Sequence, residues 1–496
     1  MRNFLFYFSL LLTLFIRTEV TGQSVLLSPG NIDENGLDYA KVIGQDEAGV
    51  YVLMSNLSLE TSRDHFGLKS RKYEMSYYSY NLQEKWHKVP EANPTTSYVE
   101  NISFFNNQLI VISSEELKGG EVRLYITVYN DKGEITIKGK QIYTGTISKN
   151  SDLAKPRILV SPDKTKLGLA LEDQKNDGIT IHFCALNDQF EVVRQGKETI
   201  SYSTKDATLS DYVITNKADF LFLGYTKEMQ ADGDKSKLRI FNLFFMPNGE
   251  AGVKTFPFNN MDQQMTEAAL VLDKNNNKAI VTGFFADKSS FPGASLLYGT
   301  LNLQQPEKFI VHTGLLNNDA QLKLVGQRNA GGGISLFNYP IQRVIPRSDG
   351  GALVIAEAAY LSEYSFYDYF TQTFNRRVEF HFDNILALSV NADGTVHWSQ
   401  LIRKEQTSLD DEGLYSSFNI VLSPEELFII YNNDIGRKNE IIGEAINAQG
   451  KTTTRTFSKS SDSISILPRA GKQVDEDTFI VPAVTKKKLF LVKIVI

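Results

Sequence analysis

The chain has 496 residues, of which 42% are apolar, 22% charged and 11% aromatic, and these values are typical of a globular protein with a large core. A single cysteine excludes an internal disulfide framework and any zinc or iron–sulfur site built from cysteines. The formal net charge is −6, from 52 basic and 58 acidic residues, so the composition offers no basic excess for nucleic acid.

The first segment has the pattern of an export signal. Arg2 precedes an uncharged apolar run at residues 4–16, which is too short to span a bilayer as a helix and suits a signal-peptide core. Small residues stand before Gln23, where we expect cleavage. Charged residues directly after the run make an uncleaved anchor the less favoured alternative. We therefore expect residues 1–22 to be removed and the protein to be exported, periplasmic or extracellular, without a membrane span.

A repeat of fifty to sixty residues runs through residues 23–496. A turn rich in Asn and Gly, between two β-rich runs, occurs seven times at spacings of 49, 57, 60, 55, 89 and 56 residues. Such dipeptides supply the positive φ that tight hairpins need. The turns begin at Asn81, Asn130, Asn187, Pro247, Asn302, Asn391 and Asn447.

A second kind of turn precedes each of these, and a short run of β-branched or aromatic residues follows it. There are eight turns of this second kind. They lie at residues 45–49, 106–107, 161–164, 215–217, 273–277, 347–351, 423–425 and 475–477.

Each repeat therefore predicts four strands, A to D, joined by short A–B and C–D turns. The last repeat ends in strand C at residues 489–496, and the run at residues 24–28 is a spare strand that can complete it. This pattern predicts an all-β fold, a single β-propeller of eight four-stranded blades, closed by the N-terminal strand joining the C-terminal blade. Seven blades remain an alternative if one repeat is divided wrongly, and two β-sandwich domains are the structural rival.

Two of the turns resemble those of known propellers. Ser161-Pro162-Asp163-Lys164 is similar to the Ser-Pro-Asp-Gly turn of TolB-type propellers, and the segment from Asn391 to Trp398 is similar to quinoprotein-like blades. As a whole, the chain resembles secreted bacterial propellers of unassigned activity. The resemblance implies a fold and a compartment, and it carries over no functional residues. With only two tryptophans in the chain, we expect no quinone or other cofactor.

The predicted loops are long on one face of the ring. In a propeller, the B–C and D–A connections share a face, and here they include residues 55–72, 227–237, 357–383 and 403–417. Long loops on a rigid scaffold commonly carry binding residues. The acidic run Asp410–Asp411–Glu412 in the last of these loops offers carboxylates for a cation, but a solvated surface loop is the favoured interpretation, and no metal site is expected.

The loop at 357–383 is the main candidate site. Nine of the 23 residues from 360 to 382 are aromatic, against 11% in the whole chain, and charged residues lie among them. Tyr and Arg combine apolar area with fixed hydrogen-bond donors, which is the composition of a recognition surface. The alternatives are an extended hairpin whose aromatic residues pack over a neighbouring blade, and a contact between two copies. The candidate binding residues are Tyr360, Glu363, Tyr364, Tyr367, Asp368, Tyr369, Arg376, Arg377 and His381.

Two functions follow from this pattern. The favoured hypothesis is an exported scaffold that binds a protein or glycan partner, at the cell envelope or outside the cell, through the loop-rich face. The alternative is an extracellular or periplasmic hydrolase or lyase with carboxylates and histidine at the same mouth. Its candidate residues are Arg63, Asp64, His65, Glu363, Asp368 and His381. The sequence leaves the ligand and the oligomeric state open.

Overall fold

The computed structural model describes residues 25–28, 37, 39–56, 72–147, 152–175, 178–201, 207–229, 237–258, 263–287, 295–316, 320, 324, 336, 338–370, 372–435, 439–458, 464–485 and 488–496. The predicted signal at residues 1–22 lies outside these ranges, as do Arg63, Asp64 and His65. Within them, no helix is both long enough and apolar enough to cross a membrane.

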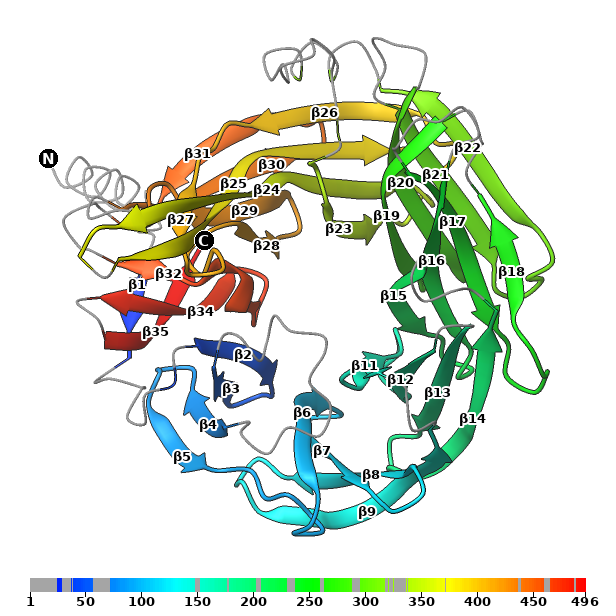
Figure 1. The fold of residues 1–496 in the computed structure, drawn as a ribbon. Coiled ribbons are helices and arrows are strands. Elements are labelled where there is room, and N and C mark those ends of the chain that lie inside the picture. The colour runs from blue at the N-terminus through cyan, green and yellow to red at the C-terminus, as the bar shows by residue number, and fades with distance from the viewer. Residues whose placement is uncertain are drawn as a thin grey trace, which may run out of the picture.

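Eight separate antiparallel sheets form a ring of blades, which confirms the predicted propeller with eight blades (Figure 1). The first blade has β2 (Tyr39–Gln45), β3 (Gly49–Ser55), β4 (Tyr73–Ser79) and β5 (Glu84–Lys88). The second has β6 (Tyr98–Phe105), β7 (Gln108–Glu116), β8 (Glu121–Tyr129) and β9 (Ile135–Thr146). The third has β10 (Asp152–Leu153), β11 (Arg157–Val160), β12 (Leu167–Lys175), β13 (Gly178–Leu186) and β14 (Val192–Ile200). The fourth has β15 (Ala207–Ile214), β16 (Phe220–Met229), β17 (Lys237–Met246) and β18 (Lys254–Pro257).

The remaining blades follow the same order along the chain. The fifth has β19 (Gln263–Asp273), β20 (Lys278–Asp287), β21 (Ser295–Asn302) and β22 (Phe309–Leu315). The sixth has β23 (Ile341–Pro346), β24 (Ala352–Asp368), β25 (Thr373–Val390) and β26 (Val396–Ile402), with β27 (Thr407–Leu409) added to β25. The seventh has β28 (Phe418–Leu422), β29 (Glu426–Asn432), β30 (Ile441–Asn447) and β31 (Thr452–Thr456). The eighth has β32 (Ser465–Ile466), the short 3₁₀ helix η2 (Pro468–Ala470), β33 (Lys472–Gln473), β34 (Thr478–Thr485), β35 (Lys488–Val495) and β1 (Val25–Leu27).

The N-terminal strand pairs where the sequence predicted. β1 runs antiparallel to β35, with Val25 opposite Ile494, and it is the outermost strand of the eighth blade. The first and eighth blades also share one apolar cluster, to which Val50 of β3 and Leu491 of β35 belong. The first blade of the chain therefore packs directly on the last.

The burial pattern explains why these residues form these strands. The middle strands of a blade are covered on both faces by neighbouring blades, so β3 and β13 are buried at every residue and read as continuous apolar runs. The outer strands have one face exposed to solvent, so more exposed and less exposed side chains alternate along most of β14. The turns carry the predicted chemistry. Asn130 accepts hydrogen bonds from the amides of Lys132 and Glu134 at 3.0 and 2.9 Å, and Gly133 adopts a φ of +70°.

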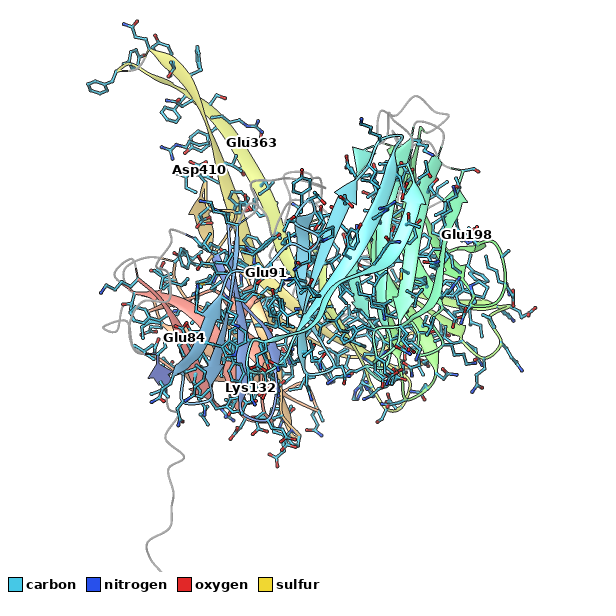
Figure 2. The ribbon with its side chains drawn as sticks, turned by 90° about the horizontal axis from the view of Figure 1, so that it is seen from below. Glu84, Glu91, Lys132, Glu198, Glu363 and Asp410 are labelled. Carbon is cyan, nitrogen blue, oxygen red and sulfur yellow. The ribbon has the colours of Figure 1, made fainter. Side chains whose placement is uncertain are left out.

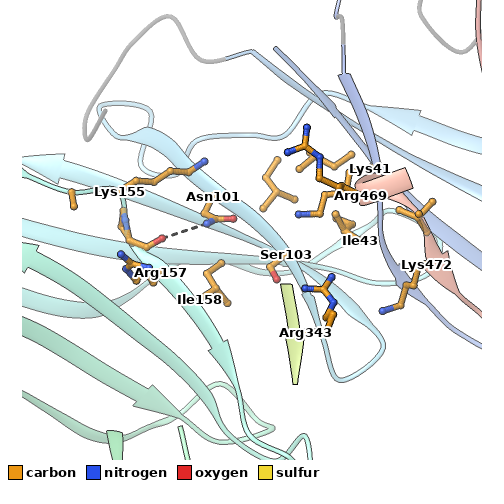
Figure 3. Close-up of a pocket in the computed structure, with 16 residues that line it drawn as sticks. Lys41, Ile43, Asn101, Ser103, Lys155, Arg157, Ile158, Arg343, Arg469 and Lys472 are labelled. Carbon is orange, nitrogen blue, oxygen red and sulfur yellow. Dashed lines mark hydrogen bonds between the residues drawn. The ribbon is translucent and has the colours of Figure 1, made fainter. Parts of the chain in front are cut away.

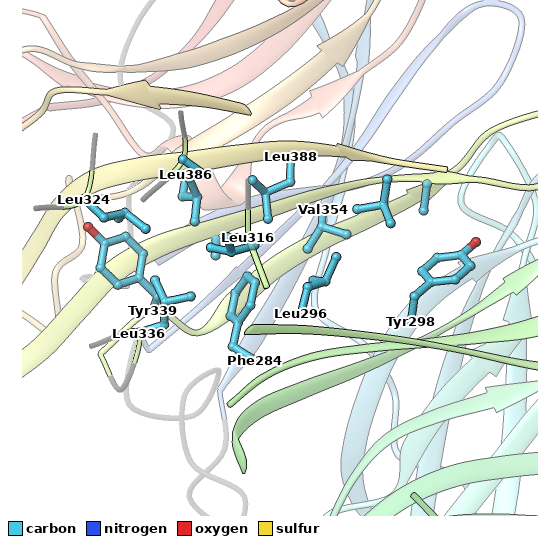
Figure 4. Packing of buried hydrophobic residues seen from close by; sticks show 14 of the residues in the cluster. Phe284, Leu296, Tyr298, Leu316, Leu324, Leu336, Tyr339, Val354, Leu386 and Leu388 are labelled. Atoms are coloured by element: carbon cyan, nitrogen blue, oxygen red, sulfur yellow. The ribbon is translucent and has the colours of Figure 1, made fainter. Parts of the chain in front are cut away.

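Apolar clusters between neighbouring blades form the core. Each of the eight blade-to-blade interfaces contains one such cluster of buried residues. Figure 4 shows the interface of the fifth and sixth blades, where Phe284 of β20 and Leu296 of β21 meet Val354 of β24 and Leu386 of β25. The core is thus divided into wedges between blades, and each blade depends on both of its neighbours.

A carboxylate fixes the first A–B turn and gives a pH-dependent prediction. Asp46 accepts hydrogen bonds from Tyr51 and Tyr77 at 2.7 Å and from the Ala48 and Gly49 amides at 2.9 Å. Burial raises the pKa of Asp46, but these hydrogen bonds outweigh burial and hold the pKa below 3.8. A carboxyl with a lowered folded pKa stabilises the protein above its unfolded pKa and loses that contribution as pH falls through the folded value.

We therefore expect Asp46→Asn to lower the free energy of unfolding by about 1–3 kcal/mol near neutral pH. The difference from the wild type should begin to shrink below about pH 4, where the unfolded chain takes up the proton. It should be lost only when the pH falls through the lower pKa of the folded carboxyl. Urea unfolding of both proteins at several pH values checks this expectation. A difference that stays constant into strong acid would contradict the role given to the ionised carboxylate.

Candidate functional site

The segment 357–383 lies between the second and third strands of its blade as predicted, and it forms the extended hairpin that the sequence left open as an alternative to a loop. β24 and β25 have 17 and 18 residues, and a bulge between Glu357 and Ala359 separates the part inside the blade from the part beyond it. Ten cross-strand pairs follow the bulge, from Ala359 opposite Phe382 to Asp368 opposite Thr373. At ~3.3 Å per residue, this arm is ~33 Å long. Figure 2 shows it standing out from one face, with Glu363 along it and Lys132 at the opposite face.

The aromatic side chains of the arm are exposed. Tyr369, Phe370 and Phe374, which we call the tip, have 84%, 101% and 78% of their surface accessible. Tyr360, Tyr364, Phe366 and Tyr367 are each between 38% and 45% exposed. The three side chains of the tip therefore do not pack over a neighbouring blade, whereas the other aromatic side chains of the arm are partly covered.

Contacts within the arm give it a defined shape. Tyr360 stacks on His381, the residue directly opposite, with ring centroids 4.4 Å apart. Tyr367 meets Tyr369 and Phe374 edge to face, each at 5.1 Å. The Tyr360–His381 pair packs across the two strands near the base of the arm, and the exposed contacts around Tyr367 orient the tip.

Charged groups add to this packing. Arg376 forms an ion pair with Glu363 on the opposite strand, and both side chains are largely exposed. The predicted residues Arg376 and Glu363 are thus brought together, although an ion pair in water contributes little to stability.

The connection 403–417 braces the arm from the side, as its predicted position on the same face requires. β27 pairs with β25 between Glu379 and His381. Asp410 accepts a hydrogen bond from the Val378 amide at 2.9 Å and forms an ion pair with Arg377 at 2.6 Å. These two interactions, the amide first, hold the pKa of Asp410 below its ordinary value. The Asp410 carboxylate therefore binds the arm and is no free surface charge.

A buried polar network holds the base of the arm. Lys404 and Glu357 form an ion pair at 2.8 Å, and neither side chain is exposed. Lys404 also donates to the carbonyl of Phe382 in β25 at 2.6 Å and to Gln406 at 2.8 Å. Ser417 donates to the other oxygen of Glu357 at 2.5 Å. The arm is therefore tied to the blade by hydrogen bonds that water does not reach.

The structure places all nine predicted residues on this arm, from Tyr360 on β24 to His381 on β25. Asp368 is the last residue of β24 and faces Thr373 across the strands. Two of the residues suggested for acid–base chemistry are engaged by other groups of the arm. The Glu363 carboxylate is paired with Arg376, and the imidazole ring of His381 is stacked on Tyr360. Arg63, Asp64 and His65 lie outside the described residues.

Sequence reasoning missed two sets of residues. Phe370 and Phe374 were passed over because the selection favoured aromatic residues with a polar tip, yet they are the most exposed rings of the arm, together with Tyr369. The second set is a group of basic side chains around the central cavity. No linear motif marks them, because they come from strands of different blades.

Comparisons with known proteins add no family. No protein-family model and no curated protein sequence matches this chain. Among solved structures, the WD40 domain of SCAP from fission yeast has a TM-score of 0.41 and 9% identity, over 95% of this chain and 98% of that one. The polysaccharide lyase Uly1 has a TM-score of 0.37 and 9% identity, over 97% and 94%. The α-L-arabinanase of Penicillium chrysogenum has 0.30 and 12%, over 59% and 97%. Similarity this low supports no conclusion about activity.

Proposed function

We propose that this protein is a recognition module that binds a protein partner through the tip of the β24–β25 arm. The observation that carries the proposal is the exposure of Tyr369, Phe370 and Phe374 at 84%, 101% and 78%. Three large aromatic side chains exposed to water at the end of the arm contribute little to the stability of the propeller. Buried in a partner, such side chains are the residues that dominate binding energy.

The geometry of the rings favours a protein over a glycan. Tyr367 meets Tyr369 at an interplanar angle of 85° and Phe374 at 63°, so these rings form no flat platform on which a sugar would stack. The face of Tyr360 is already covered by His381. A narrow projecting tip fits an apolar groove of another protein, because the groove can cover the rings from several sides.

Binding is also favoured over catalysis. Among the described residues that line the central cavity there is no carboxylate and no histidine. The aromatic cluster lies on an arm that leaves the face of the ring (Figure 2). The proposal includes export of the protein to the envelope or the medium, for which residues 1–22 are the support.

Site-specific photo-crosslinking tests the proposal. A benzoylphenylalanine at position 370 is expected to capture one protein partner in cells, in the envelope or the medium. In binding measurements with that purified partner, Tyr369→Ser and Phe374→Ser should each weaken affinity about thirtyfold, since a buried aromatic anchor contributes about 2 kcal/mol. The thermal unfolding midpoint should not change, because both side chains are exposed.

Val193→Ser and Leu315→Ser are matched controls, since they remove exposed apolar side chains from outer strands of other blades. Both should bind the partner with wild-type affinity. A crosslink to a second copy of the chain, or tip-dependent binding to a glycan array without a protein partner, would overturn the proposed partner. Recovery of the protein in the cytosol alone would overturn its proposed location.

A further inference from the structure

Basic side chains surround a cavity on the central channel of the ring. Its volume is about 520 Å³, within the range of about 300–1,000 Å³ found for small-molecule sites. The basic residues come from four blades, as Figure 3 shows. They are Lys41 of β2, Lys155 before β11, Arg157 of β11, Arg343 of β23, Arg469 of η2 and Lys472 of β33.

The positive charge in this cavity is poorly balanced. No acidic side chain is among the described residues that line it. Arg157 is neutralised, because it forms an ion pair with the buried Glu172 at 3.1 Å. Arg469 donates to the main-chain carbonyls of Glu412 and Gly413 at 2.9 and 2.7 Å, which hold its position but leave its charge. The cavity is therefore strongly cationic in a protein whose formal net charge is −6.

Three of the six cations carry the argument. Lys41, Arg343 and Lys472 form no ion pair with any carboxylate in the described part of the chain. Burial, and then the charges of Lys164 and Lys41, lower the pKa of Lys472. Like charges crowded in this way destabilise a fold, and an anion between them removes that repulsion.

The lining also indicates what kind of anion fits. Among the described residues around the cavity there is no aromatic side chain, so nucleobases and sugar rings would find no ring to stack on. Apart from the cations, the polar side chains there are Asn101 and Ser103. Recognition must therefore depend on charge, and Lys and Arg bind phosphate, sulfate and carboxylate groups with charge-assisted hydrogen bonds.

We propose that the central cavity binds a compact molecule with several oxyanion groups. Cations supplied by separate blades require a ligand that presents more than one negative group, because a single group cannot contact them all. The site is independent of the tip, since it lies on the channel and the tip lies at the end of the arm.

Calorimetric titration of the full chain tests this proposal with three probes, which distinguish the sources of the oxyanion. The probes are inorganic tripolyphosphate for phosphate, citrate for carboxylate and a sulfated heparin disaccharide for sulfate. At least one probe is expected to bind, and its affinity should fall as salt is added. Arg343→Ala and Lys472→Ala should each weaken that binding about tenfold or more, because each removes a charged contact.

The matched control is Lys85→Ala with Lys132→Ala, which removes two exposed positive charges away from the channel and should leave the affinity unchanged. A second readout covers the folding of the variants. Without ligand at low salt, Lys472→Ala should unfold at the same temperature as the wild type or at a higher one, since repulsion is relieved.

Three results would overturn the proposal. The first is no binding of any probe. The second is binding that the control weakens as much as the channel variants do. The third is a single-stranded oligonucleotide that binds more tightly than the probes and is displaced by them, which would make the channel a nucleic-acid site.

Discussion

Lys404→Ala is expected to lower the free energy of unfolding by about 3–5 kcal/mol, because it leaves the Glu357 carboxylate buried without its counter-charge. The two groups are 2.8 Å apart and neither is exposed. Burial raises the pKa of Glu357 and lowers the pKa of Lys404, which shows how much the surroundings disfavour an isolated charge on either group. Urea unfolding followed by fluorescence measures the loss.

A double replacement separates the loss of the pair from the loss of the counter-charge. Lys404→Met with Glu357→Leu removes both charges, so most of the lost stability should return. Arg376→Ala breaks the exposed pair with Glu363 in the same arm and should cost less than about 1 kcal/mol. A loss below about 1 kcal/mol for Lys404→Ala would show that water or another group replaces the lysine, against the structure described here.

Phe284→Ala is expected to lower the free energy of unfolding by about 3–5 kcal/mol, the usual range for a buried phenylalanine. The ring is fully buried between the fifth and sixth blades and lies against residues of both (Figure 4). The resulting cavity is lined by both blades. Neither blade can move in to fill it without moving away from the neighbour on its other side. Thermal and urea unfolding give the size of the effect.

Phe374→Ala is the control for this replacement, since it removes the same ring from an exposed position. It should change the free energy of unfolding by less than about 0.5 kcal/mol. If Phe284→Ala were equally mild, the wedge between these blades would have to be able to collapse, and the division of the core into tight interblade clusters would be wrong.

Much of the fold was predictable because turn chemistry is local. Asn130 and Gly133 fix a tight turn through hydrogen bonds and a positive φ that the sequence alone specifies. Regular spacing of such turns then gives the number of blades, and the strand left over at Val25–Leu27 indicates where it pairs. These signals depend on neighbouring residues and need no knowledge of distant contacts.

The arm was recognised as unusual, but its structure was not predictable. The spacing of 89 residues and the aromatic content located it correctly. Whether this segment is a hairpin or a loop depends on pairing between distant residues such as Tyr360 and His381. Whether its aromatic side chains are exposed depends on whether a neighbouring blade contacts them. Composition describes neither condition, so a packed hairpin and a free arm remained equally compatible with the sequence.

The central cavity could not be found from the sequence, for a different reason. Lys41 and Lys472 lie more than four hundred positions apart, and neither belongs to a run of basic residues. The net charge sums over the whole surface, and the acidic residues outnumber the basic ones. Only the ring brings these few cations to one place, so a whole-chain argument against anionic ligands does not apply to the channel.

The pairing of β1 with β35 places the start and the end of the described chain in the same blade. Val25 lies opposite Ile494, so the two ends of the folded chain are neighbours within one sheet. A circular permutant that links them and opens at the turn after Asn130 would keep every interblade cluster, because termini in exposed turns are well tolerated. We therefore expect the permutant to have nearly the stability of the wild type, although its blades would be made in a different order along the chain.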